Sequence, residues 1–384
     1  MSFATIAFSI DAMLPALPEI GHALTPQNLN RAQLIVTSFL LGLGLGTLFT
    51  GPLSDAFGRR RILLGGYGIY IIGAVLGYLA GSLELMLAAR VLQGIGAAGP
   101  RVVAVAVVRD IYSGRQMAKL MSFVITVFML VPVIAPSIGA VIITLSGWRV
   151  IFVAFVIFAL ISSIWFSLRQ PETLPVEKRR KFQLGPLWGG VKEVLANRSV
   201  RITIAVQALL SGVLYAMLSS AQQVFEITFD QGANFPLWFG AIAIIAGASG
   251  LLNAKLVIQL GMVFLVRSAL ICVMLISFSL LVIIWLDLMP ARLYFPGFLV
   301  FMTSVFFMIG MTLGNLNAIA MEPMGHIAGM AASIISAIAT VIGVVIAVPI
   351  GLAFDGTPLP LMIGVFCCVA LSLGLMQLIR SDSA

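Results

Sequence analysis

Two ionisable residues, Asp11 and Arg90, lie deep inside apolar stretches of the sequence. An ionisable side chain at membrane depth costs roughly 3 kcal/mol on insertion scales, so its presence there indicates a function. Counted from the ends of their stretches, the two residues lie at depths that agree to within roughly 3 Å. Burial favours a neutral acid, whereas a nearby guanidinium favours the anion. We therefore expect Asp11 to bind and release a proton with Arg90 as its partner; a permanent ion pair that only joins two helices is the alternative.

A second group of charges lies in the stretch GPLSDAFGRRR, although only 9% of the chain is charged. Its glycines, Gly51 and Gly58, permit a close helix approach and a tight backbone. The arginines that begin at Arg59 oppose transfer of the loop across a membrane, but an acidic residue contributes little to orientation. We expect Asp55 to pair with Arg109 or to face the N-terminus of a neighbouring helix. Such a contact would latch helix ends together in one conformation.

Further polar residues could line a cavity between helices. Arg101 lies eleven residues beyond Arg90, so both side chains leave the same helix face, about 16 Å apart. Arg101 could bind an anionic or carbonyl-rich substrate, or extend to the membrane surface. In a later stretch, polar residues recur at three- and four-residue steps: Gln207, Ser211, Tyr215, Ser219 and Gln222. This face could line a wet cavity or only join helices by hydrogen bonds.

The composition requires membrane-spanning helices to position these residues. Of 384 residues, 61% are hydrophobic and 9% are charged, whereas a soluble domain carries about 25% charged residues. The apolar stretches are much longer than the ~10 residues of barrel strands, so helices are indicated. At about 20 residues per crossing, we predict twelve spans at 2–20, 32–54, 62–80, 84–108, 117–144, 148–168, 200–225, 235–256, 262–286, 292–314, 326–352 and 358–379.

The lysines and arginines predict the orientation. Loops after even-numbered spans, with the C-terminus, hold seventeen of them, whereas loops after odd-numbered spans hold three. Basic residues stay on the cytoplasmic side, so both termini are expected in the cytoplasm. The formal charge of +8 is therefore a topology signal with some attraction to anionic lipid, rather than a sign of nucleic-acid binding.

The longest polar stretch follows the sixth span and divides the chain. We predict a bundle of six helices at 1–168, a cytoplasmic linker at 169–199 and a second bundle of six at 200–384. Within the linker, apolar residues at helical spacing predict a short helix on the membrane face, with a plain linker as the alternative: Leu184, Trp188, Val191 and Leu195. Parallel repeats of six helices are an organisation that many transporters use.

Two prolines and a glycine mark the fifth span. Pro132 and Pro136 remove backbone donors and bend the helix, and Gly139 lets a neighbour come close. We expect close packing against a helix of the other half; a simple packing kink is the alternative.

Several motifs resemble one transporter family. The pattern Gly-x-Leu-x-Asp-x-x-Gly-Arg-Arg-Arg resembles the signature loop of the major facilitator superfamily. RVLQGIGAAGPRVVAVAVVRD, which includes Arg90 and Gln93, is similar to the span-four motif of its twelve-helix drug/proton antiporters. VPVIAPSIG resembles their span-five antiporter motif, and DAMLPALPEI with PETL resembles the Bcr/CflA branch of multidrug efflux proteins.

The resemblance implies an all-α membrane protein with the major facilitator fold, twelve helices in two bundles of six. It implies a cavity that includes Gln93, a cytoplasmic gate at the Asp55 loop, and a leak-restraining role for the helix of Pro132, Pro136 and Gly139. Two features depart from the family pattern. In the corresponding loop of the second half, Ile258 takes the place of Asp55, so no second latch is expected. The first span has almost no polar residues before it, so the natural start could lie upstream.

We expect a monomeric, proton-coupled exporter of amphipathic small molecules in the bacterial inner membrane. A dedicated exporter of one metabolite, such as an amino acid derivative, is the alternative. The sequence has no nucleotide-phosphate loop, no His-Glu-x-x-His stretch and no nucleophile elbow. We therefore expect neither ATP drive nor an enzyme, no cofactor or metal, and no nucleic-acid partner. The three cysteines lie in apolar stretches and predict no disulfide framework.

Overall fold

The computed structural model describes residues 2–112, 114–179 and 182–379, and the regular elements in these ranges are all helices. Helices are the expected solution because lipid offers no partner for backbone N–H and C=O groups. Two of them begin at an N-cap residue whose own side chain accepts a backbone N–H: Ser82 accepts that of Leu85 at 3.3 Å, and Asn197 accepts that of Val200 at 3.2 Å.

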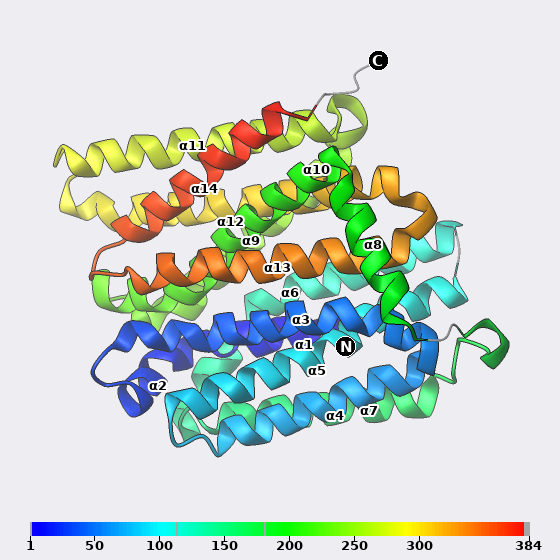
Figure 1. Ribbon diagram of the computed structural model, residues 1–384. Helices are drawn as coiled ribbons and strands as arrows, with labels where there is room; N and C mark the ends of the chain where they lie inside the picture. Colours follow the sequence, from blue (N-terminus) through cyan, green and yellow to red (C-terminus); the bar gives the residue numbers. More distant parts are fainter. Residues whose placement is uncertain (1, 113, 180–181, 380–384) are drawn as a thin grey trace.

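The first six spans occupy the lower part of Figure 1. They are the broken first span and five continuous helices: α1 (Ser2–Asp11) with η1 (Leu14–Ala16) and α2 (Leu17–Leu24), α3 (Leu34–Phe57), α4 (Arg59–Tyr78), α5 (Leu83–Ile111), α6 (Gly114–Ser146) and α7 (Val150–Arg169).

The break in the first span corrects the prediction of one helix over 2–20. The α-helix ends at Asp11, a 3-10 turn follows, and α2 carries the chain on to Leu24. Pro15 explains the position of the break, because a proline ring clashes with the carbonyl group four residues earlier, here that of Asp11. The acidic side chain therefore lies at a helix end inside the bundle.

The last six spans occupy the upper part of Figure 1. They follow the short helix α8 (Leu184–Ala196) and are α9 (Arg198–Gln223), α10 (Phe235–Leu260), α11 (Met262–Trp285), α12 (Ala291–Met321), α13 (Ala328–Leu352) and α14 (Leu359–Gln377). A π-helical turn, η4 (Val224–Thr228), extends α9.

Length and hydropathy alone mark ten membrane candidates within the described residues. One candidate, Ala291–Leu352, holds both α12 and α13, and part of α6 is marked separately as the shorter apolar helix Leu130–Ser146. Counting these elements separately gives twelve spans in the described ranges, so the predicted all-α, twelve-helix fold is confirmed.

The two groups of six helices meet along α3 and α13, where small residues allow close approach. A Cβ atom on Gly44 of α3 would lie 3.0 Å from Thr340 of α13, and one on Gly51 would lie 3.1 Å from Ser333. Elsewhere, α6 meets α10, where a Cβ on Gly240 would lie 3.2 Å from the carbonyl oxygen of Val133.

The predicted linker helix is present as α8, and one side of it packs against the protein. Leu187 and Val194 are buried, whereas Trp188 and Leu195 are exposed. Leu187 and Val194 belong to an apolar cluster that includes Ile334 of α13. We call the end of the bundle that carries α8 and Arg59 the basic end, and the end that carries α2 the opposite end; they lie at the right and left of Figure 1.

Candidate functional site

Arg90 is completely buried in the first half and is held by uncharged groups. Its guanidinium donates to the carbonyl oxygen of Ser9 at 3.0 Å, to that of Ile35 at 3.2 Å and to Gln93 Oε1 at 2.7 Å. Its Cζ atom also lies 4.5 Å from the centre of the Phe39 ring, within cation–π range. Arg90 therefore joins the first, second and fourth spans.

Asp11 is also buried, with 3% of its surface exposed, and the permanent ion pair with Arg90, which was the alternative interpretation, is not formed. Arg90 binds the backbone of Ser9, two residues before Asp11, so the two charged residues lie in one region without pairing. No hydrogen bond to another described residue involves the carboxyl group of Asp11. A buried carboxyl group without a cation partner is the kind of group that carries protons in transporters.

Gly139 of α6 lies against the break beside Asp11. A Cβ atom at this position would lie 2.2 Å from the carbonyl oxygen of Ala12, closer than any side chain allows. The predicted partner of Gly139 in the other half is therefore wrong, because Ala12 belongs to the first span. The helix that carries Pro132 and Pro136 does contact the other half, but through Val133 and Gly240.

At the basic end, Arg59 is the centre of the charged cluster. It donates to Asp55 at 2.5 Å, to Asp110 at 3.1 Å and to the hydroxyl group of Ser54 at 2.6 Å. The predicted Asp55–Arg109 pair is not formed because Arg59, four residues along, occupies Asp55. Arg109 instead lies beside the start of α13, where a Cβ on Gly329 would be 3.7 Å from its Nη1 atom.

The linker completes this cluster, a role that sequence reasoning missed. Glu172 accepts the backbone N–H groups of Arg59 at 2.9 Å and Arg60 at 3.1 Å, so it caps the N-terminus of α4. Thr173 donates to Asp110 at 3.1 Å. Both residues belong to the PETL stretch. An acidic residue in a linker can accept the free N–H groups at the start of a helix, and Glu172 could have been predicted on that basis.

The uncharged polar residues predicted to line a cavity are buried, but they differ in their hydrogen-bond partners. Gln207, Tyr215, Ser219 and Gln222 are all buried in α9, and Gln93 is buried in α5. Tyr215 Oη is 3.5 Å from Thr340 Oγ1. The amide nitrogen atom of Gln207 has no hydrogen-bond partner in the described structure, so it is available to a ligand or to water.

Arg101 lies half-buried on α5, eleven residues beyond Arg90. It forms none of the ion pairs among the described residues. Its two predicted roles, substrate binding and extension to the membrane surface, both stay predictions.

At the opposite end, amide side chains join the two halves. Gln223 of α9 donates to Asn30 at 2.6 Å, and Gln33 donates to Gln223 at 2.6 Å. Ser220 donates to Gln33 at 2.9 Å, and Asn30 donates to the carbonyl oxygen of Phe354 at 2.7 Å. We call Asn30, Gln33, Ser220 and Gln223 the amide cluster. Sequence reasoning missed it because isolated amides in a long chain give no pairing signal.

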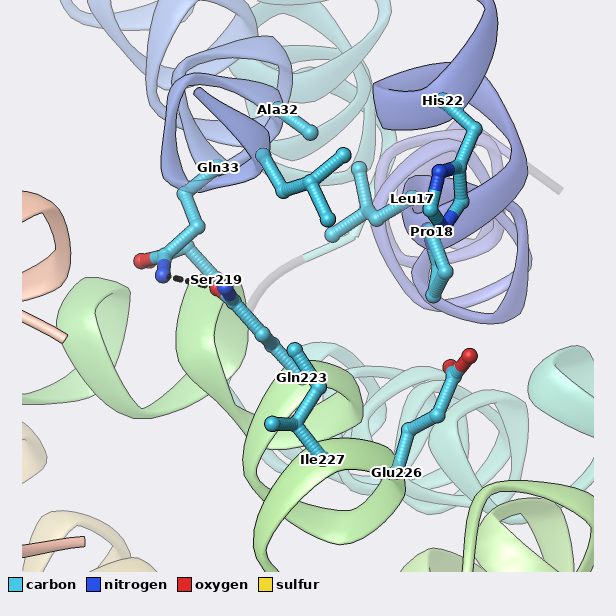
Figure 2. A pocket seen from close by; sticks show the side chains of 10 residues that line it. Leu17, Pro18, His22, Ala32, Gln33, Ser219, Gln223, Glu226 and Ile227 are labelled. Carbon is cyan, nitrogen blue, oxygen red and sulfur yellow. Dashed lines mark hydrogen bonds between the residues drawn. The ribbon is translucent and has the colours of Figure 1, made fainter. Parts of the chain in front are cut away.

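A pocket of about 160 Å³ lies beside the amide cluster, between the two halves. Figure 2 shows Leu17, Pro18 and His22 on one side, and Gln223, Glu226 and Ile227 on the other. Of the predicted cavity residues, Ser219 lines it; Gln207, Tyr215 and Gln222 do not. The remaining lining residues are Leu29, Ala32 and Gln33.

Comparison with known proteins identifies relatives of this chain. A family model described as Major Facilitator Superfamily matches residues 1–348. The uncharacterized MFS-type transporter YdgK of Bacillus subtilis is 29% identical over 355 residues, which are 90% of this chain and 85% of that protein. The bicyclomycin resistance protein homolog of Haemophilus influenzae is 28% identical over 374 residues, 95% of this chain and 90% of that protein.

A solved structure shows the same fold. The crystal structure of a D-xylose-proton symporter superposes with a TM-score of 0.74, covering 98% of this chain and 95% of that chain. The sequence identity is 17%, so the likeness concerns the fold alone.

Proposed function

The chain belongs to the Major Facilitator Superfamily, a family of membrane transporters rather than enzymes, and from that premise we propose that it is a proton-coupled antiporter of amphipathic small molecules. It exports them across the bacterial inner membrane as a monomer. The name of the Haemophilus influenzae relative, a bicyclomycin resistance protein homolog, supports drug-like substrates.

The observation that carries the proposal is the environment of Asp11. Its carboxyl group is buried at the end of a broken helix, without a cation partner among the described residues. Gly139 keeps α6 against the same break. A movement of α6 or of the broken span would change the water around Asp11, and a change in water access is what lets a buried acid exchange its proton.

Contacts at the two ends support alternating access. At the basic end, Gly51 and Ser333 join the halves, and at the opposite end the amide cluster does. We propose that each set of contacts breaks in turn while the bundles at 1–168 and 200–384 rock around the cavity. The charge distribution of the loops supports an orientation with the basic end and both termini in the cytoplasm.

The experiment uses purified protein in liposomes that are acidic inside and hold a pH dye. Cationic, neutral and anionic drugs are added in turn, and protein-free liposomes serve as the control. Antiport of a drug into the liposome moves protons out, so the internal pH should rise.

A rise with several unrelated drugs supports a multidrug antiporter. A rise with one compound alone would instead favour the dedicated metabolite exporter. No rise with any compound, from protein that still elutes as a folded monomer, would contradict proton-coupled export of drugs.

A further inference from the structure

The pocket at the opposite end has one wall from each half of the protein. Leu17, Pro18 and Leu29 contribute apolar surface from the first half, and Ile227 contributes it from the second. Figure 2 shows Glu226 across the pocket from Pro18 and His22. The pocket therefore combines an apolar wall with a carboxylate, the pattern of a small-molecule site.

Glu226 has no cation partner within the described residues. The four ion pairs found there involve other acids: Asp55, Glu84, Asp110 and Glu193. The hydrogen bond that Glu226 accepts comes from the neutral amide of Gln222 at 3.3 Å. The imidazole of His22 lines the same pocket but lies beyond ion-pair distance. The negative charge of Glu226 is thus available to a ligand.

The surrounding loops reinforce this negative charge. Two of the three arginines at this end have other partners: Arg31 pairs with Glu84 at 3.5 Å, and Arg149 stacks on Trp148 with 4.3 Å between its Cζ atom and the ring centre. The described loops and helix ends of this end carry six acids and three arginines: Glu19, Glu84, Glu226, Asp230, Asp287 and Asp355, against Arg31, Arg149 and Arg292. A cation approaching this end is therefore attracted to it.

The volume limits what the pocket can hold. A cavity of roughly 150 Å³ is large enough for one benzene ring, and this one measures about 160 Å³. It accommodates one ring or one quaternary ammonium head, not a whole drug-sized molecule.

We propose that this pocket is a second binding site, used on exit, for the head group of an organic cation, with Glu226 as its counter-charge. The proposal rests on the proposed function, because it names the class of molecule that leaves through this end. Gln33 and Gln223 line the pocket and also join the halves. A cation bound there lies directly against the hydrogen bonds that must break when this end opens.

The test measures protection of a cysteine in the pocket. The three native cysteines are replaced by serine, and Ile227→Cys introduces a thiol in the lining. Purified protein in detergent reacts with a maleimide, with and without phenyltrimethylammonium; benzenesulfonate, an anion of similar size, is the comparison. We expect phenyltrimethylammonium to slow the reaction and benzenesulfonate to leave it unchanged.

Two charge-neutralising variants separate a direct contact from a general surface potential. Glu226→Gln should raise the half-protecting concentration of phenyltrimethylammonium about fivefold, the upper range for an exposed ion pair. Asp230→Asn removes the same charge four residues away, outside the pocket, and should leave that concentration within about twofold. Glu226→Asp, which keeps the charge, should retain most of the protection.

Absence of protection, equal protection in Glu226→Gln, or equal loss in the Asp230→Asn control would overturn the proposal. The result is independent of the liposome experiment, because binding in detergent needs no proton gradient. In an Asp11→Asn background, protection by phenyltrimethylammonium should persist even though transport is lost. A positive drug panel without protection would reject the exit site and leave the proposed function standing.

Discussion

The two halves of the molecule have a turn with the same backbone conformation, but the side chains around the two turns differ. Gly58 joins α3 to α4 with φ 98° and ψ 151°, and Gly261 joins α10 to α11 with φ 79° and ψ 155°. Three residues earlier, the first loop has Asp55 and the second has Ile258, a residue that is 89% exposed. The fold repeats the turn, but among the described residues the charged cluster is found at the first turn and not at the second.

The same contrast extends to the buried residues. Asp11, Arg59 and Arg90 are buried charges, and all belong to the first half. In the second half the described buried polar residues are uncharged, such as Gln207 and Asn315. Asn315 donates to Asn253 at 2.7 Å, a neutral link between α12 and α10. We infer that the first half handles the proton and the second half offers neutral hydrogen bonds to the substrate.

The largest expected effect separates the halves by function. Asp11→Asn removes the proton-binding group while keeping its shape, and we expect proton-coupled transport to fall by roughly 100-fold or more. Gln207→Leu removes a buried amide of the second half, and we expect a loss of about tenfold at most, equivalent to 1.4 kcal/mol. The liposome pH assay measures both rates. Equal losses of transport rate in the two variants would contradict the proposed division of roles between the halves.

The next prediction compares two helix glycines. Gly139→Ala places a Cβ 2.2 Å from the oxygen of Ala12, whereas Gly314→Ala in α12 meets no atom within 4 Å. Gly139→Ala should cost about 3 kcal/mol by overpacking, and Gly314→Ala should be neutral or stabilise by about 0.5 kcal/mol. Thermal unfolding in detergent ranks the two, and a Gly139→Ala protein as stable as Gly314→Ala would show that the break beside Asp11 is not tightly packed.

A smaller difference is expected between the two loop glycines. Alanine at either position strains the backbone, because both have positive φ, at a cost of about 1–3 kcal/mol. A Cβ on Gly58 would also lie 2.5 Å from Glu172 Oε2, whereas one on Gly261 meets nothing within 4 Å. Gly58→Ala should therefore be less stable than Gly261→Ala by about 1 kcal/mol, the worth of a lost cap. Identical unfolding temperatures of the two variants would contradict the capping role of Glu172.

The smallest effect tests the charged cluster itself. Arg59→Gln leaves Asp55 and Asp110 without their cation, while Arg267→Gln removes hydrogen bonds to the carbonyl groups of Met376 and Ile379. We expect each to destabilise by about 1 kcal/mol. High salt should reduce the difference between Arg59→Gln and the native protein, because the carboxylate of Asp55 that Arg59 pairs with is partly exposed and is screened. The Arg267→Gln difference should not respond, and an equal response in both variants would contradict the ionic role of Arg59.

Much of the fold could be predicted because long apolar stretches have few alternatives to helices. The break after Asp11 was also readable, since Pro15 follows it by four residues, but the apolar run across it concealed the interruption. The short linker helix was predicted, although its buried face depends on contacts with α13 that periodicity alone does not specify.

The site was less predictable because it depends on which partners meet in space. Similar depths of Asp11 and Arg90 predicted that the two side chains face each other, yet Arg90 satisfies its donors with carbonyl oxygens and an amide. Asp55 pairs with Arg59 rather than with Arg109, because Arg59 is only four residues away in the chain. The amide cluster joins residues about 190 positions apart, such as Gln33 and Gln223. The domain boundaries in the linker and the role of Arg101 stay predictions.

We propose that one carboxyl group, that of Asp11, exchanges its proton for substrate. The most direct measurement of this exchange is the proton release when a transported drug is added to purified protein in unbuffered detergent solution, for the native chain and for Asp11→Asn. About one proton should be released per drug bound by the native protein, and none by the variant. Undiminished release from an Asp11→Asn protein that still binds the drug would contradict this proposal.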